Sequence, residues 1–303
     1  MNTILIAGAT GFVGKSLTRF LLEKGYSIHA FTREKQESTH PNLSYFQWNV
    51  SNGFIDENAF ENVTTIINLT GTNIGDKRWT KKRKIEILDS RVKSIQLLYD
   101  FVQKHNIKID SFISSSAVGY YGAVTTPEIF TENALNGNDF LADVCKKWEA
   151  AALQFSILGV RTIILRKGVI IGKDGGIYQK LAPLAKQGIN TALGNGKQFL
   201  PWIDIRDLVR LYDFILTHQE ISGVYNTVAT AQITMNEFSK NIVHSFGKRI
   251  FLPNAPIFLL KILFGEMSVM LLEGSKVSNE KLKKTGFSFE FDTIEKSLAG
   301  YIF

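Results

Sequence analysis

Apolar and polar residues alternate along the first half of the chain in a pattern that predicts strands separated by helices. Short apolar runs predict strands, and longer stretches in which apolar residues recur every three or four positions predict helices. The predicted strands are residues 3–7, 27–32, 43–48, 64–70, 111–115 and 160–166, and the clearest helices are residues 82–105 and 139–158. Such alternation predicts an α/β fold with a doubly wound parallel sheet.

The second half of the chain has a different pattern. After Gly168 the alternation stops, and six glycines punctuate a stretch that we expect to consist mainly of loops. A helix at 206–218 and a strand at 224–228 follow, and we expect them to return to the sheet. The predicted division is a Rossmann-type domain of residues 1–167, rejoined by about 204–228, and a smaller C-terminal substrate-binding region within residues 168–303.

A glycine-rich turn, Gly8-Ala9-Thr10-Gly11-Phe12-Val13-Gly14, joins the first predicted strand to a helix. In this context the first glycine permits the tight turn, the second lets the backbone approach a pyrophosphate, and the third lets the helix pack close to its strand. The N–H groups at the start of the helix would point at the phosphates. We expect the turn to bind a dinucleotide through Gly8, Thr10, Gly11, Phe12, Val13 and Gly14.

The end of the second predicted strand indicates which dinucleotide binds. An acidic residue there would bond the ribose hydroxyls of NAD, whereas this chain has Phe31-Thr32-Arg33. The guanidinium of Arg33 could pair with the 2′-phosphate of NADP. The alternative is a solvated surface arginine. The pattern favours NADP over NAD as the cofactor.

Polar and small residues follow two further strands, in Asn68-Leu69-Thr70-Gly71 and in Ser114-Ser115-Ser116-Ala117. Ligands of an open parallel sheet lie over the carboxyl ends of its strands. We therefore expect the cofactor to contact Leu69, Thr70, Gly71 and Ser114. Ser116 is expected to bond a substrate oxygen, although strand-end serines can instead bond local backbone groups.

Composition and charge narrow the choice of partners. The net charge of +7 is spread along the chain apart from one basic cluster at residues 77–84, which disfavours nucleic-acid binding. Cys145 is the only cysteine and the five histidines are far apart, so neither a disulfide nor a metal site is expected. The apolar stretch 256–264 is interrupted by Lys261 and too short to span a membrane. We expect a cytoplasmic protein, which could form a homodimer, with a small-molecule substrate.

Taken together, these motifs resemble those of the extended short-chain dehydrogenase/reductases. The resemblance rests on the glycine turn, the serine triplet followed by Val118-Gly119-Tyr120-Tyr121-Gly122, the pair Thr131-Glu132, and Arg166-Lys167-Gly168-Val169. Residues 139–149, 194–204 and 282–289 resemble more closely the atypical, nucleoside-diphosphate-sugar epimerase-like subfamily, which carries a C-terminal domain of unknown function. The resemblance covers nearly all of the chain. It implies an NADP-binding Rossmann domain, a cofactor contact at Arg166, and a sugar-like or nucleotide-linked substrate.

One departure from the extended pattern affects the expected catalysis. Extended members use a Tyr-xxx-Lys pair on the helix after the fifth strand, with the tyrosine as acid/base and the lysine lowering its pKa. Counting back from Glu149, these two positions hold Leu141 and Cys145, which cannot do that work. Two functions stay open. One is an NADP-dependent epimerase or oxidoreductase in which Tyr121 is the acid/base beside Ser116, and the other is an NADP-binding sensor or scaffold without turnover.

Overall fold

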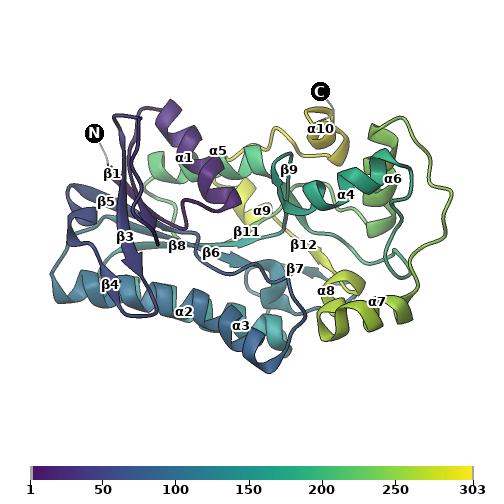
Figure 1. Ribbon diagram of the computed structural model, residues 1–303, viewed down its shortest axis with the longest axis horizontal. Coiled ribbons are helices and arrows are strands. Elements are labelled where there is room, and N and C mark those ends of the chain that lie inside the picture. The colour runs from purple at the N-terminus through teal and green to yellow at the C-terminus, as the bar shows by residue number, and fades with distance from the viewer. Residues whose placement is uncertain (1–2, 302–303) are drawn as a thin grey trace.

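The computed structural model describes residues 3–301 and has an eight-stranded sheet at its centre (Figure 1). The strands are β1 (Thr3–Ala7), β2 (Ser27–Thr32), β3 (Leu43–Asn49), β4 (Phe54–Ile55), β5 (Val63–Asn68), β6 (Ser111–Ala117), β8 (Arg161–Lys167) and β11 (Gly223–Thr227). Their order is β11-β8-β6-β5-β1-β2-β3-β4, and every neighbouring pair is parallel except β3 with β4. The predicted doubly wound α/β fold is confirmed.

Helices cover both faces of this sheet (Figure 1). Helices α1 (Phe12–Glu23) and α5 (Ile205–Thr217) pack on one face, and α2 (Lys81–Lys104) and α3 (Phe140–Ile157) pack on the other. Successive residues of a strand point to opposite faces, so Ile163 and Leu165 of β8 join the first core while Ile164 joins the second. Burial on both faces explains why these strands are continuous apolar runs in the sequence.

Beyond β8 the chain builds a second core outside the sheet. Its elements are β9 (Val169–Gly172), α4 (Gly176–Lys186), β10 (Trp202–Asp204), α6 (Met235–Ser245) and α10 (Ile294–Ala299). The prediction of loops was wrong for residues 176–186, because Pro183 and the flanking glycines weaken the helical pattern. Helix α5 and strand β11 then return the chain to the sheet, where β11 pairs with β8. The division into two domains, whose terminal residues 1–2 and 302–303 lie outside the described part, stays a prediction.

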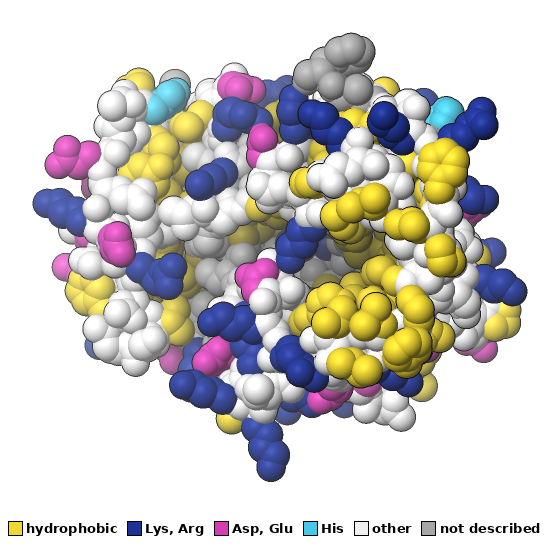
Figure 2. Space-filling view, turned by 45° about the vertical axis from the view of Figure 1, so that its right-hand side comes forward, with side chains coloured by type: hydrophobic (Ala, Val, Ile, Leu, Met, Phe, Trp, Pro, Cys, Tyr) yellow, Lys and Arg dark blue, Asp and Glu magenta, His cyan; other side chains and the backbone are white. Residues whose placement is uncertain are grey.

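The remaining elements are short. They are β7 (Ile129–Phe130), β12 (Lys276–Val277), α7 (Ile257–Phe264), α8 (Val269–Leu272), α9 (Glu280–Lys283) and the 3-10 turns η1 (Glu57–Phe60), η2 (Val118–Tyr121) and η3 (Gly265–Ser268). Strands β7 and β12 pair with each other and join the two halves of the chain. Apolar side chains gather on the surface at the lower right of Figure 2, where α7 lies in Figure 1.

A buried ion pair fastens α3 to the carboxyl end of β8. Arg166 donates from Nε to Oε1 of Glu149 at 2.9 Å and from Nη2 to Oε2 at 2.8 Å. Glu149 also accepts a hydrogen bond from the Ser116 hydroxyl at 2.6 Å. From Nη1, Arg166 donates to the Tyr121 hydroxyl at 3.0 Å and to the carbonyl oxygen of Glu132 at 3.2 Å. One guanidinium thus holds β6, β8, α3 and η2 together.

Removing one partner of this pair should leave an uncompensated buried charge. We expect Glu149→Leu to lower the free energy of unfolding by about 3–5 kcal/mol, measured by urea denaturation. The double variant Glu149→Leu/Arg166→Met should recover part of that loss. Asp143→Ala, which breaks the exposed pair with Lys147, is the control and should cost less than about 1 kcal/mol. If the double variant loses as much unfolding free energy as Glu149→Leu and Arg166→Met lose together, the two charges do not stabilise each other.

Candidate functional site

The glycine turn brings the end of β1, the start of α1 and the loop after β5 into contact. Gly8 has a φ of +88°, and a Cβ on it would lie 2.9 Å from the backbone carbon of Leu69. A Cβ on Gly14 would lie 2.2 Å from the carbonyl oxygen of Gly8. A Cβ on Gly11 would meet only that same oxygen among the described residues, at 3.4 Å. The packing of the chain itself therefore requires Gly8 and Gly14 to be glycine, whereas Gly11 borders open space.

The first turn of α1 has no side-chain cap. Gly11 is the N-cap residue and makes no side-chain hydrogen bond, and the first turn, with Phe12 and Val13, carries no acidic residue. Thr10 precedes it with an exposed side chain. Uncapped N–H groups at a helix start are donors for a phosphate group, and the helix dipole favours negative charge there. The turn therefore suits the pyrophosphate of a dinucleotide.

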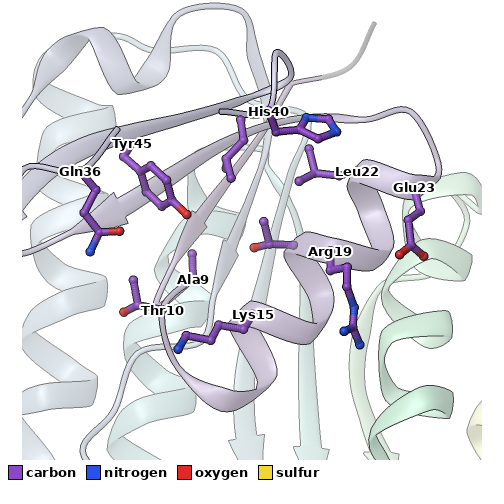
Figure 3. A pocket seen from close by; sticks show the side chains of 11 residues that line it. Ala9, Thr10, Lys15, Arg19, Leu22, Glu23, Gln36, His40 and Tyr45 are labelled. Atoms are coloured by element: carbon purple, nitrogen blue, oxygen red, sulfur yellow. The ribbon is translucent and has the colours of Figure 1, made fainter. Parts of the chain in front are cut away.

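A cavity of about 590 Å³ lies beside the turn, between α1 and β3 (Figure 3). Polar side chains from the turn, α1, β3 and the connection after β2 line it, namely Thr10, Lys15, Thr18, Arg19, Glu23, Gln36, His40 and Tyr45. Arg33 stands at the start of that connection with an exposed side chain. Lys15, which the sequence analysis missed, adds a second cation close to the turn. Lys15 could have been identified from the sequence by its position one residue after the third glycine, in the first turn of the helix.

The loop after β5 lies against the glycine turn. The backbone N–H of Leu69 donates to the carbonyl oxygen of Ala7 at 2.8 Å, and the Thr70 hydroxyl donates to Oδ1 of Asn68 at 2.7 Å. The other amide atom of Asn68, Nδ2, is buried and has no partner among residues 3–301. Gly71 follows with a φ of +152°. The structure therefore places the predicted cofactor contacts Leu69, Thr70 and Gly71 beside the turn, with an unused donor next to them.

A second cavity, of about 270 Å³, lies over the carboxyl ends of β6 and β8. Most of its wall is apolar and includes the side chains of Phe130, Val144, Leu200 and Met270. Its cationic side chains are Arg91 and Lys167. A small, mainly apolar cavity with a few polar groups at strand ends is typical of a small-molecule site.

Lys167 is the last residue of β8 and its side chain is partly buried. Its Nζ donates to the Ser115 hydroxyl at 2.7 Å, and that hydroxyl lies 3.5 Å from the hydroxyl of Tyr212. No carboxylate forms a salt bridge with Lys167 within the described part of the chain. Burial, reinforced by the positive charge of Arg91, lowers the pKa of Lys167 to about 7. A lysine in this state can both give and take a proton near neutral pH.

Arg91 and Trp148 bring further donors to this cavity. Arg91 donates to the carbonyl oxygens of Ile87 at 2.9 Å and Thr72 at 3.1 Å, and burial lowers its pKa to about 10. Its guanidinium lies 5.0 Å from the ring of Trp148. The indole Nε1 of Trp148 is buried without a hydrogen-bond partner among the described residues. An unpartnered buried donor in a cavity wall can donate a hydrogen bond to a ligand oxygen.

The positions of the missing catalytic pair face this same cavity. Leu141 and Cys145 both line it from α3. Burial, reinforced by the charge of Glu149, raises the pKa of the Cys145 thiol to about 12, so the thiol stays protonated and unreactive. The neighbouring cations of α3, Lys146 and Lys147, are exposed, and Lys147 pairs with Asp143. The cavity therefore lacks the usual tyrosine and lysine but receives a different lysine from β8.

The two predicted catalytic residues lie at the buried network below the cavity. Tyr121 lines the cavity, but its hydroxyl donates to Oδ1 of Asn226 at 2.6 Å and accepts from Arg166. Burial raises the pKa of Tyr121 to about 12. The Ser116 hydroxyl donates to Glu149 and is 1% exposed. Their catalytic roles stay predictions, and each would require an existing hydrogen bond to be exchanged.

Two predicted cofactor contacts are also engaged within the protein. Arg166 is bound to Glu149, and its guanidinium lies 3.4 Å from the ring of Tyr120. The Ser114 hydroxyl is buried and donates to the carbonyl oxygen of Ser115 at 3.1 Å. Their contacts with a cofactor stay predictions. The sequence analysis did not single out Lys167, because the family resemblance assigns a cofactor contact to its neighbour Arg166. A lysine at the end of an apolar strand was nevertheless a signal that could have identified it.

Other kinds of site receive no support within residues 3–301. In that part of the chain no group of three or more His, Cys, Asp or Glu side chains is placed to hold a metal ion. None of its helices combines the length and the apolar character that crossing a membrane requires. The two cavities and the glycine turn are therefore the features from which a function can be argued.

Comparison with known proteins agrees with this geometry. The model of the NAD dependent epimerase/dehydratase family matches residues 4–227, and a domain of unknown function, DUF1731, matches residues 255–300. The chain belongs to the NAD dependent epimerase/dehydratase family. Its resemblance to the epimerase-like subfamily with a C-terminal domain of unknown function is thereby confirmed.

Relatives in this epimerase/dehydratase family match over nearly their whole lengths. Epimerase family protein ML0860 of Mycobacterium leprae is 32% identical over 300 residues, which cover 98% of this chain and 94% of that protein. YfhF of Bacillus subtilis is 31% identical over 299 residues, covering 99% and 97%. The crystal structure of human epimerase family protein SDR39U1 (isoform2) with NADPH is similar with a TM-score of 0.86, 28% identity and 99% coverage of both chains. MoeE5 in complex with UDP-glucuronic acid and NAD, at 18% identity and a TM-score of 0.80, shares the fold.

The lowered pKa of Lys167 predicts a pH dependence of stability. The unfolded chain binds a proton at this lysine up to its ordinary pKa, whereas the folded chain releases it near pH 7, so stability falls as pH falls through this window. Lys167→Met should remove that slope, which is at most about 1.4 kcal/mol per pH unit. Urea denaturation of both proteins between about pH 7 and 10 measures it. Parallel stability curves would show that Lys167 is protonated in the folded protein.

Proposed function

We propose that this protein binds NADP at the glycine turn and uses it to interconvert a small carbonyl compound and its alcohol in the cavity beside Lys167. The observation that carries the proposal is the position of Lys167. Lys167, which forms no salt bridge with a carboxylate among residues 3–301, lines a mainly apolar cavity at the strand ends. Arg91 lines the same cavity and lies beside Gly71, in the loop after β5 that contacts the glycine turn. The human relative SDR39U1 was solved with NADPH, which supports the choice of cofactor.

The residues present fit a dinucleotide. The open side of Gly11, the uncapped first turn of α1 and the unused Nδ2 of Asn68 supply space and donors for its phosphates and its amide. Arg33 and Lys15 would hold the 2′-phosphate, because both are exposed cations. Lys15 lines the cavity beside the turn, and Arg33 follows β2, whose end pairs with the end of β1. When bound, a reduced nicotinamide supplies a hydride to a carbonyl carbon.

Lys167 would complete the reaction by moving the proton. In its charged form it gives a proton to the carbonyl oxygen during reduction, and in its neutral form it takes the proton from an alcohol during oxidation. Arg91 and the Nε1 of Trp148 would hold the substrate oxygens. The apolar wall excludes water, which strengthens these interactions. In the alternative assignment, Tyr121 is the acid/base and Ser116 bonds a substrate oxygen.

The size of the cavity bears on the substrate. Its volume of about 270 Å³ is at the lower end of ligand sites, so a small carbonyl compound fits better than a whole nucleotide sugar. A nucleotide-linked substrate remains the alternative, because the solved MoeE5 structures of the same fold hold UDP-glucuronic acid and UDP-glucose. The cytoplasmic location and the homodimer stay predictions, and the Arabidopsis thaliana relative is called chloroplastic.

A non-catalytic NADP-binding role is the second candidate function. It is favoured by the two positions of the missing pair, since Leu141 and Cys145 face the cavity and neither can transfer a proton at neutral pH. In that case the cavity would bind a ligand without converting it, and the binding of that ligand would depend on the state of the cofactor. Turnover by the wild-type protein separates the two functions.

The cofactor assignment predicts tighter binding of NADPH than of NADH. One charge-assisted contact with the 2′-phosphate should contribute roughly 1.5–3 kcal/mol, or about tenfold or more in affinity, and Arg33→Ala should remove most of the preference. Calorimetric titration of both cofactors measures it. Equal dissociation constants for the wild-type protein would rule out the proposed 2′-phosphate contact.

Gly11→Val provides the complementary test of the turn. Its side chain should block the pyrophosphate while leaving the fold intact, because only one backbone oxygen borders that position. Gly75→Val, in a turn where an added Cβ would come no closer than 3.6 Å to another atom, is the matched control and should bind NADPH normally. Normal NADPH binding by Gly11→Val would mean that the cofactor does not lie over the turn.

The assignment of Lys167 predicts the pH profile of turnover. Reduction should need the charged lysine, so its rate should fall as pH rises through about 7, and oxidation should show the opposite dependence. Lys167→Met should lose about 10²- to 10⁴-fold in rate while still binding NADPH. Single-turnover oxidation of NADPH with small aldehydes, ketones and ketosugars measures both.

The same single-turnover rates are measured for Tyr121→Phe and Ser116→Ala. These variants test the alternative in which Tyr121 is the acid/base and Ser116 bonds the substrate. A rate that is lost in Tyr121→Phe and kept in Lys167→Met would transfer the acid/base role to the tyrosine. Tight NADPH binding without oxidation by any carbonyl compound would favour the non-catalytic role.

A further inference from the structure

Helix α7 exposes an unusually apolar face. Five of its eight residues are large aliphatic or aromatic side chains that remain 41–67% exposed, namely Ile257, Phe258, Leu259, Ile262 and Leu263. Only Leu260 is fully buried in this helix. Isolated exposed apolar residues are common in proteins, but contiguous groups mark a surface that contacts something other than water.

The apolar face continues onto a neighbouring segment. Residues 249–257 run beside residues 188–194, joined by backbone hydrogen bonds of 2.9 Å from Ala255 to Ala192 and from Gly194 to Ala255. Phe251 is 85% exposed and Ile189 is 44% exposed on these segments. We call the set Ile189, Phe251, Leu252, Ile257, Phe258 and Ile262 the α7 surface (Figure 2).

The segments that contain the α7 surface are cationic. Residues 175–203 and 238–265 contain no Asp or Glu, and they hold Lys180, Lys186, Lys197, Lys240, Lys248, Arg249 and Lys261. Seven of the 35 Lys and Arg lie in these segments and none of the 28 Asp and Glu, while the basic cluster at residues 77–84 holds six further cations. Within residues 3–301, only Lys180 of the seven forms a salt bridge, with Asp76.

We propose that the α7 surface binds an anionic lipid membrane, with α7 lying on the membrane rather than crossing it. Exposed phenylalanine, isoleucine and leucine side chains can enter the boundary between headgroups and acyl chains, while lysine and arginine around them meet the anionic headgroups. Eight residues are far too few to span a bilayer, so only surface attachment is possible.

The charge distribution disfavours a second copy of the chain as the partner. A twofold interface sets the same patch against itself, so the cations Lys248, Arg249 and Lys261 of one copy would meet the cationic patch of the other. Like charges brought together at an interface oppose association. An anionic surface has the complementary charge and therefore fits better.

The α7 surface also borders the cavity that contains Lys167. Helix α7 leads through η3 into α8, and Met270 of α8 lines that cavity. The side chain of Leu272 lies beside Gly194, which is next to Ile257. A membrane bound at α7 would lie close to one wall of the cavity. The membrane proposal does not depend on the proposed reaction.

Vesicle flotation of the full-length protein tests the proposal. The probes are vesicles of phosphatidylcholine alone and of phosphatidylcholine with about 30% phosphatidylglycerol. We expect binding to the anionic vesicles, weaker binding at high salt, and little binding to the neutral ones. Phe258→Ser/Ile262→Ser and Lys248→Glu/Arg249→Glu should each reduce the partition coefficient about tenfold or more.

Matched control variants distinguish membrane binding by the α7 surface from non-specific binding by exposed residues elsewhere. Phe54→Ser/Ile157→Ser removes exposed apolar residues elsewhere, and Lys104→Glu/Lys108→Glu reverses two exposed cations at the end of α2. Both controls should float like the wild-type protein, and circular dichroism checks the fold of every variant. Absence of flotation with anionic vesicles would overturn the proposal, as would equal flotation of the α7 and control variants. Dimerisation lost in Phe258→Ser/Ile262→Ser, without flotation of the wild-type protein, would assign the surface to a second copy.

Discussion

The buried ion pair between Arg166 and Glu149 is the interaction on which the carboxyl edge of the sheet depends. Two charges with side chains no more than 7% exposed are tolerated only when they neutralise each other and their remaining hydrogen-bonding atoms are used. Here Ser116, Tyr121 and the backbone of Glu132 meet that requirement. Each of these groups comes from a different segment, so satisfying one guanidinium fixes the relative positions of the segments that surround the cavity.

The neighbouring cation, Lys167, is in the opposite situation. It follows Arg166 directly on β8, and successive residues of a strand point to opposite faces, so Glu149 cannot serve both side chains. Lys167 finds a serine hydroxyl instead of a carboxylate. The same desolvation that makes Arg166 bind its carboxylate firmly therefore lowers the pKa of Lys167 toward neutrality. Two adjacent cations of one strand are thus stabilised in different ways, one by a carboxylate and the other by a hydroxyl group.

The distribution of charge follows a similar division over the whole molecule. The part of the chain that forms the sheet and its helices has only a small excess of cations, whereas the segments around α4, α6 and α7 hold seven cations and no acidic residue, together with exposed apolar side chains. The stability of the core needs neither feature, because the second core is filled by buried residues such as Trp202 and Phe238. Features that the fold does not need are those most readily explained by a partner.

The sequence by itself determined the sheet, the glycine turn and the absence of the usual catalytic pair. These follow from local patterns: runs of apolar residues buried on both faces, glycine where a Cβ has no room, and residue types at fixed spacing on one helix. The tertiary structure alone decided which polar side chains were engaged and which remained available. Arg166 and Lys167 are adjacent cations in the sequence, and only the position of Glu149 on α3 distinguishes them. The helix around Pro183 and the apolar face of α7 likewise depend on contacts with distant segments, because propensity is weak there and burial is a property of the packed chain.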